Sequence, residues 1–226
     1  MKVTVLRVLL WIVLTGSAVA QEGAAMVSVT GEGQVAVAPD MAVISLGVVH
    51  VDQTAGAAMD KVSADVGALM AVLAAQGIAA RDIQTSQVSV TPVRDNRADG
   101  GRRITGFEAR NAVTVRVRDL GGLGGVLDQV LEAGTNTLGG LRFQLQDTGA
   151  AQAEARAAAV RDAVAKAEQL SAAAGVTLGP VLAISEGGVG PQPEMFAAAA
   201  RSVDVPIAAG ELIVSVRVSM RFALAP

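Results

Sequence analysis

Residues 104–118 read ITGFEARNAVTVRVR, and this stretch shows the clearest alternation of apolar and polar side chains in the sequence. In its second half every other residue is valine, and the residues between are Thr114, Arg116 and Arg118. A period of two places alternate side chains on opposite faces of a β-strand. The pattern therefore predicts a strand with one packed face and one polar face, which is typical of antiparallel sheets.

Further strands are expected on both sides of this one. The last of them, 211–223, repeats the alternation and carries Arg217 and Arg221 on its polar face. In the first, the triplet Gly31-Glu32-Gly33 predicts an interruption by a glycine bulge or kink. The complete set of additional strands is predicted at 26–38, 41–51, 82–93, 138–146, 181–186 and 211–223.

Helices are expected over 55–76, 120–133 and 150–174, where apolar residues recur at intervals of three and four. Each segment is followed by a glycine that can end a helix. Asp119 is the expected N-cap of the second helix, and Asp147 or Thr148 that of the third. The third helix is rich in alanine, and its apolar stripe is predicted to comprise Ala157, Val160, Val164, Ala167 and Leu170.

The order strand–helix–strand–strand occurs twice, over about 41–118 and 138–224. The sequence therefore predicts an α+β fold with two βαββ-like repeats, in which long helices lie on one face of a largely antiparallel sheet. Residues 21–226 are expected to form a single domain that contains this pseudo-repeat.

The N-terminus has the pattern of a secretory signal peptide. Lys2 and Arg7 precede the apolar run VLLWIVL (8–14), and Ala18-Val19-Ala20 provides small residues for cleavage after Ala20. The run is shorter than the ~20 residues that span a bilayer, and a lipoprotein is excluded because the sequence has no cysteine. We expect export from the cytoplasm and no transmembrane span in the mature chain.

Composition narrows the possible chemistry. The chain has no Cys, no Tyr, one His and 2% aromatic residues, so disulfides, thiol catalysis and haem attachment are excluded. Its net charge of −3 becomes more negative when Lys2 and Arg7 are removed, which argues against a nucleic-acid partner. Neither a cofactor nor a metal site is predicted.

No catalytic constellation is visible in the sequence. His50 follows the phase of Ile44 and Leu46 on the second strand, which favours a structural role; a hydrolase built around His50 is the alternative. The glycines at 31–33 and 120–125 lack the complete patterns of nucleotide-binding loops. No carboxylate pair has the spacing of a glycosidase or metal motif, and G-x-S-x-G is absent. We therefore expect a protein that is not an enzyme.

Arginines on strand faces are the strongest remaining signal of a site. If their strands were neighbours, several guanidinium groups would converge and could bind carboxylates or phosphates. They could also pair with acidic residues of another subunit, or remain a solvated face with scattered ion pairs. The candidates are Arg116, Arg118, Arg217, Arg221 and Arg142.

The segment 187–210 is expected to be a long loop with three prolines. Loops of this length are often functional or disordered. Met195 and Phe196 give it apolar character, which suggests docking on the body of the protein or on a neighbouring subunit. A homo-oligomer is therefore expected.

The chain resembles the SIMPL-domain family, which includes bacterial periplasmic immunogenic and outer-membrane-associated proteins. An ordered set of segments across most of residues 21–226 carries the resemblance. They are VTGEGQVAVAPDMAVISLGV (29–48), DIQTSQVSVTP (82–92), ITGFEARNAVTVRVRDL (104–120), AGVTLGPVLAISEGG (174–188) and PIAAGELIVSVRVSMRF (206–222).

The resemblance implies an exported α+β protein of the periplasm or cell envelope, from a family without an established reaction. It also implies links to envelope and oxidative-stress phenotypes and ring-like or channel-like oligomers, but supplies no catalytic residue. We therefore expect a non-enzymatic, oligomer-forming envelope protein with a structural or stress-related role. The alternative is a binding module that holds an anionic small molecule or envelope polymer with the strand arginines.

Overall fold

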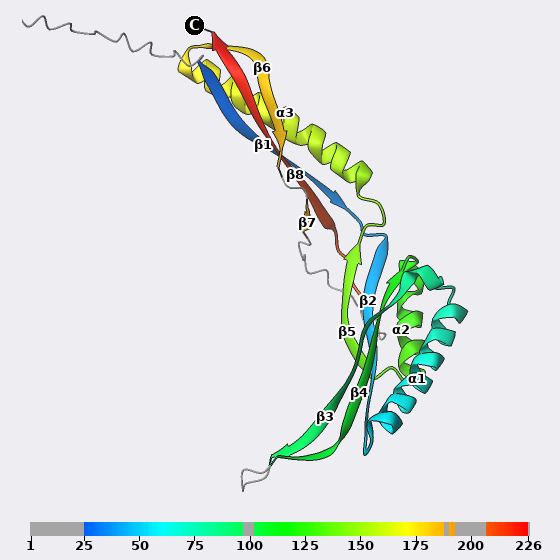
Figure 1. Cartoon of the computed structure of the whole chain (residues 1–226). Coiled ribbons are helices and arrows are strands. Elements are labelled where there is room, and N and C mark those ends of the chain that lie inside the picture. Colours follow the sequence, from blue (N-terminus) through cyan, green and yellow to red (C-terminus); the bar gives the residue numbers. More distant parts are fainter. Residues whose placement is uncertain (1–24, 97–101, 188–189, 193–206, 226) are drawn as a thin grey trace, which may run out of the picture.

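The computed structural model of the protein describes residues 25–96, 102–187, 190–192 and 207–225. In this part of the chain the strands form two antiparallel sheets of four strands each, arranged along an elongated molecule (Figure 1). The middle of the sequence, residues 41–144, forms one sheet with its helices, which we call the central lobe. The two ends of the described sequence form the other sheet and helix, which we call the terminal lobe.

In the central lobe the strand order is β3-β4-β2-β5. Helices α1 and α2 cover one face of this sheet (Figure 1), and we call the other face, on which no described helix lies, the bare face. The elements are β2 (Met41–Asp52), α1 (Ala55–Ala75), β3 (Ile83–Asn96), β4 (Arg102–Val117), α2 (Leu123–Glu132) and β5 (Thr137–Gln144), with short 3₁₀ helices at Ala80–Asp82 and Leu120–Gly122.

The core of the central lobe consists of aliphatic side chains from the alternating faces of β2 and β4. Val113, Val115 and Val117 are all buried, as the alternation predicted. They pack against Leu69 and Leu73 of α1 and against residues of α2. Burial of this apolar surface is the main source of stability for a lobe in which no disulfide is possible.

In the terminal lobe the strand order is β1-β8-β6, and the short β7 also pairs with β8. Helix α3 lies along one face of β1 and β8 (Figure 1). The first and last strands of the described sequence are therefore neighbours over their whole length, from Met26↔Ala223 to Val37↔Leu212. The elements are β1 (Met26–Val37), α3 (Gly149–Ala174), β6 (Thr177–Glu186), β7 (Gly190–Gln192) and β8 (Leu212–Ala225).

The predicted interruption of the first strand is wrong. β1 pairs with β8 in one continuous register, without a bulge at Gly31 or Gly33. The two glycines instead allow the backbone of α3 to approach the sheet. A Cβ atom at Gly31 would lie 2.0 Å from the carbonyl oxygen of Ala159, and one at Gly33 would lie 1.9 Å from that of Ala155.

The apolar stripe of α3 was also predicted only in part. Ala167 is buried, and Val160 and Val164 pack against the core, but Ala157 is exposed and Leu170 is 53% exposed. The buried stripe instead recurs every four residues. Its members are all small, in keeping with the close helix–sheet approach: Ala151, Ala155, Ala159, Ala163, Ala167 and Ser171.

The fold class and the helix ends agree with the sequence analysis. The described chain is α+β with antiparallel strands, and Gly77, Gly134 and Gly175 follow the three helices with positive φ angles. Asp119 accepts a hydrogen bond from the amide of Gly121, but in a 3₁₀ turn that precedes α2. Asp147 accepts one from the amide of Gly149 at the start of α3.

The division of the strands between two sheets was not expected. The order βαββ occurs twice, as β2-α1-β3-β4 and β5-α3-β6-β8, but β5 pairs with β2 whereas β6 and β8 pair with each other. The second run of elements is thus shared between the two lobes. This arrangement keeps β4 and β8, which carry the candidate arginines, in separate sheets.

Candidate functional site

The five candidate arginines do not converge on one surface. Arg116 of β4 and Arg142 of β5 both lie opposite Val43 of β2, so they belong to one cross-strand row on the bare face of the central lobe. Both are exposed. Strands in a sheet are spaced by about 4.8 Å, so the two backbones are roughly 10 Å apart. An anion-binding role for this row stays a prediction.

Arg118 is held in a different network at the junction of the two lobes. Its guanidinium donates two hydrogen bonds to Asp82, at 2.9 Å from Nε and 2.7 Å from Nη2. The Asp82 side chain is only 5% exposed, and the hydrogen bonds from Arg118 keep its pKa below the ordinary range. Arg118 Nη1 also donates to Gln146 Oε1 at 2.6 Å.

Gln146 continues this network into the other linker. Its backbone amide donates to Asp40 Oδ1 at 2.7 Å, and its side-chain amide donates to the Asp40 carbonyl at 3.1 Å. Asp40 lies between β1 and β2, and Gln146 lies between β5 and α3. The chain of contacts from Asp82 through Arg118 and Gln146 to Asp40, which we call the junction network, therefore ties both linkers to the central lobe.

The arginines of β8 lie on the exposed face of the terminal lobe. Arg217 pairs with Glu32 of β1, its register partner, at 2.8 Å. Arg221 lies opposite Ser28 on β1 and Ala183 on β6. Arg118 and Arg217 already have carboxylate partners within the chain. The predicted arginine cluster is therefore divided into separate ion pairs and the row of Arg116 and Arg142.

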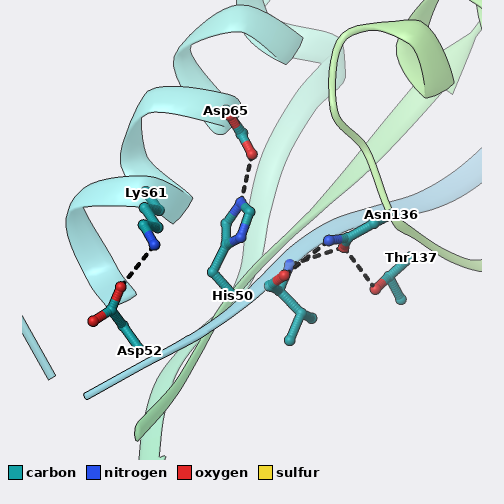
Figure 2. A network of polar contacts seen from close by, with 7 residues as sticks. His50, Asp52, Lys61, Asp65, Asn136 and Thr137 are labelled. Atoms are coloured by element: carbon teal, nitrogen blue, oxygen red, sulfur yellow. Dashed lines mark hydrogen bonds and ion pairs between the residues drawn. The ribbon is translucent and has the colours of Figure 1, made fainter. Parts of the chain in front are cut away.

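His50 faces α1, in the phase that its position on β2 predicted. Its Nε2 atom is 2.6 Å from Asp65 Oδ2, and the two side chains are 32% and 36% exposed (Figure 2). Next to this pair, Lys61 of α1 lies 2.7 Å from Asp52 at the end of β2. The two pairs join the same strand to the same helix, which supports a structural role for both.

Figure 2 also shows a side chain that bonds the backbone of β2 just beyond the stretch paired with β5. The amide of Val49 donates to Asn136 Oδ1 at 2.9 Å, and Asn136 Nδ2 donates to the Val49 carbonyl at 2.8 Å. Asn136 thus provides both hydrogen bonds that a neighbouring strand would give, just before β5 begins. Thr137 Oγ1 is bonded to Asn136 rather than directed at His50.

Sequence reasoning missed Asp65 and Asn136. Asp65 is 15 residues from His50 and lies on a different element, and Asn136 is 87 residues from Val49. Neither spacing is a recognised motif, so only the packing of α1 and β5 on β2 brings these groups together. In the residues that the structure describes, no cluster of three metal-ligating side chains was found.

An exposed apolar strip marks the outer edge strand of the terminal lobe. Val181, Leu182 and Ile184 of β6 are 46%, 52% and 59% exposed. Helix α3 packs mainly on β1 and β8, and among the described residues nothing buries these three side chains. Exposed apolar residues are unremarkable one at a time, but three within four positions on an outer strand form an apolar patch.

Most of the predicted loop 187–210, including Met195 and Phe196, lies outside the described residues, as do the signal segment and its cleavage site. One part of it, Gly190–Gln192, forms the strand β7 on β8. None of the described helices has the length and hydropathy required to cross a bilayer.

Comparison with known proteins identifies the family of the chain. A family model described as SIMPL, protein of unknown function (DUF541), matches residues 27–222. The chain is 37% identical over 210 residues to the 26 kDa periplasmic immunogenic protein of Brucella melitensis, a match that covers 88% of this chain and 84% of that protein.

Two further similar proteins bear the name uncharacterized protein YggE. The chain is 30% identical over 208 residues to that of Edwardsiella ictaluri, with 88% of this chain and 87% of the relative covered. It is 28% identical over 155 residues to that of Escherichia coli K12, with 69% and 63% covered. The similarity therefore extends over nearly all of the described chain.

Proposed function

Because the chain belongs to the SIMPL family, whose model matches residues 27–222, we propose that it is a non-enzymatic protein of the periplasm and cell envelope that assembles with copies of itself. The periplasmic location is supported by the signal-like N-terminus and by the name of the Brucella relative. A non-enzymatic role is supported by the polar networks around His50 and Arg118, in which each of these side chains has a partner that holds two elements together.

The exposed strip on β6 is the observation that carries self-assembly. A strand at the edge of a sheet presents unpaired backbone groups, and natural proteins usually protect such an edge with charged side chains or a covering element. β6 is irregular around Pro180, but it presents Val181, Leu182 and Ile184 to solvent and pairs regularly with β8 from Ala183 to Glu186. Pairing of this edge with another copy would satisfy backbone groups and remove apolar surface from water in one step.

A structural contribution to the envelope follows from the shape of the molecule. The two lobes extend end to end (Figure 1), so contacts through one lobe leave the other free to reach a second neighbour. The link to oxidative stress stays a prediction from the family resemblance. It would be tested by survival of a deletion strain under peroxide, with the wild-type gene restored as the control.

Self-assembly is tested with residues 21–226 in sedimentation velocity at micromolar concentrations. We expect a discrete species larger than one chain, and we expect the double substitution Leu182→Lys and Ile184→Lys to convert it to monomer, because burying two added charges at the edge is unfavourable. Leu131→Lys is the matched control, since Leu131 is 51% exposed but lies on α2. A wild-type protein that is monomeric at these concentrations would rule out the proposal.

A further inference from the structure

The two outer edges of the terminal sheet differ in whether side chains bind their outward backbone groups. β1 forms one edge and β6 the other, with β8 between them. In an antiparallel pair, alternate residues direct their N–H and C=O groups away from the partner strand. A further strand could pair with such groups on either edge, so the side chains near them decide which edge is available.

On β1, two of these outward backbone groups already have side-chain partners. The amide of Glu32 donates to Asp162 Oδ2 at 2.8 Å, and Lys166 Nζ donates to the Thr30 carbonyl at 3.1 Å. Asp162 and Lys166 are one turn apart on α3 and pair with each other at 2.7 Å. The three contacts form a closed cluster, which we call the edge cap.

The position of the edge cap is decisive because it lies in the middle of the strand. Thr30 and Glu32 are near the centre of the 12 residues of β1. The carbonyl of one and the amide of the other are the acceptor and donor that a further strand would use there. Strand addition along β1 therefore requires displacing both side chains of the ion pair.

The edge cap depends on the close approach of α3 to the sheet. Gly31 is the residue between Thr30 and Glu32, and a Cβ atom on it would collide with the backbone of α3. The absence of side chains at Gly31 and Gly33, together with the alanine stripe, brings the helix near enough for an aspartate and a lysine to reach the strand edge. The hydrogen bond from Lys166 and, after it, that from the Glu32 amide lower the pKa of Asp162.

We propose that Asp162 and Lys166 block strand addition at β1, so that β6 is the edge through which the terminal sheet meets a second copy. The second half of this statement rests on the proposed self-assembly, whereas the first half stands on the edge cap alone. One closed and one open edge permit β6 to pair with the β6 of another copy, which forms a closed two-fold contact. They prevent the β1-to-β6 pairing that would extend sheets edge to edge without limit.

The proposal is tested by removing the edge cap with Asp162→Ala and Lys166→Ala together. We expect the variant to form larger, polydisperse species, with a several-fold increase in weight-average mass that grows with concentration in sedimentation velocity. The added substitutions Leu182→Lys and Ile184→Lys should suppress that growth, because they close the complementary edge.

Two control variants separate the edge cap from a general loss of charge. Asp162→Asn with Lys166→Gln keeps an acceptor for Glu32 and a donor for Thr30, so it should retain the wild-type assembly. Arg156→Ala removes the ion pair between α3 and Glu186 of β6 but leaves the edge cap on β1 intact. It should therefore not produce edge-to-edge growth of sheets.

Hydrogen exchange tests the edge cap within the folded chain, without relying on assembly or on the double variant, which could misfold. Hydrogen exchange of the Glu32 amide should be at least about tenfold faster in Asp162→Ala than in wild type, and slow in Asp162→Asn, because a hydrogen-bonded amide exchanges only when the bond opens. Unchanged exchange, or unchanged mass in the folded double variant, overturns the proposal. If wild type is monomeric but the double variant associates, self-assembly fails and the edge cap holds.

Discussion

Asp82 is a buried carboxylate whose charged form is stabilised by one guanidinium group. Its side chain is 5% exposed and receives two hydrogen bonds from Arg118. Burial raises the pKa of a carboxyl group, but these bonds from Arg118 have the larger effect and lower the pKa of Asp82. A buried charge without its partner is costly, so the pair should matter more for stability than the exposed pairs elsewhere in the molecule.

This pair leads to a pH-dependent prediction. A carboxylate whose pKa falls on folding stabilises the folded state above its ordinary pKa of about 4, and this contribution is lost as the pH falls towards the lowered value. We expect Arg118→Ala to lower the free energy of unfolding near neutral pH, and the deficit to shrink at about pH 3 and below. Urea denaturation across this pH range measures both effects.

Arg142→Ala is the control for Arg118→Ala, because Arg142 is exposed and lies on the bare sheet face. It should have little effect at any pH. A deficit for Arg118→Ala that stays constant from neutral to acidic pH would show that the lost stability comes from packing of the side chain and not from the charge of Asp82.

The sequence identified which strand faces carry arginine, but it could not identify their partners. Arg118 and Asp82 are 36 residues apart, and Arg217 and Glu32 are 185 apart. Which strands become neighbours depends on long-range pairing, and no local pattern in the chain records it. The same limit applies to His50, whose position on the inner face was predicted but whose partner Asp65 was not.

At the scale of elements, the alternating strands were predictable and the buried side of α3 was not. Periodicity works for β4 because valine and polar residues differ strongly in hydropathy. In α3, alanine occurs on several sides of the helix, so the apolar pattern does not select one. The sheet selects it instead, because only small residues fit against Gly31 and Gly33.

The packing of β1 against α3 predicts a large effect from a small substitution. Gly33→Ala places a Cβ atom 1.9 Å from the Ala155 carbonyl oxygen, so the helix must move or the strand must bend. We expect a loss of about 1–3 kcal/mol or more in the free energy of unfolding, in the range of other overpacked sites. Thermal and urea denaturation of the folded protein measure this loss.

Gly67→Ala is the matched control, since Gly67 is inside α1 and has open space where its Cβ would be. It should raise stability by about 0.5–1 kcal/mol because alanine favours helix over glycine. If Gly33→Ala proves as harmless as Gly67→Ala, the close approach of α3 to β1 is not a feature of the folded protein.

At the scale of the whole molecule, the relative position of the lobes depends on the linkers between them. Both linkers, between β1 and β2 and between β5 and α3, meet in the junction network, where Gln146 bonds to Asp40 and to Arg118. Each lobe has its own core, so the lobes do not need this network in order to fold. Its expected effect is to restrict their relative orientation.

We predict that Gln146→Ala broadens the distribution of distances between the lobes without a comparable loss of stability. The chain has no cysteine, so Asp128→Cys on α2 and Glu168→Cys on α3 provide unique, exposed sites for spin labels. Pulsed electron–electron double resonance should show a wider distribution of label-to-label distances in Gln146→Ala than in wild type. Gln87→Ala, a substitution at an exposed position on β3, should leave the distance distribution as in wild type. Equal widths in the wild type, Gln146→Ala and Gln87→Ala would contradict the role of the junction network.

The pairing of β1 with β8 also sets the order in which the two lobes can be completed as the chain emerges N-terminus first. The central lobe uses one continuous stretch, residues 41–144, which the ribosome delivers early. The terminal lobe cannot close its sheet until Leu212–Ala225 has been made, because β8 is the only strand in the described chain that pairs with β1. β1 therefore stays without its partner strand until Leu212–Ala225 has followed, well after every strand of the central lobe is available.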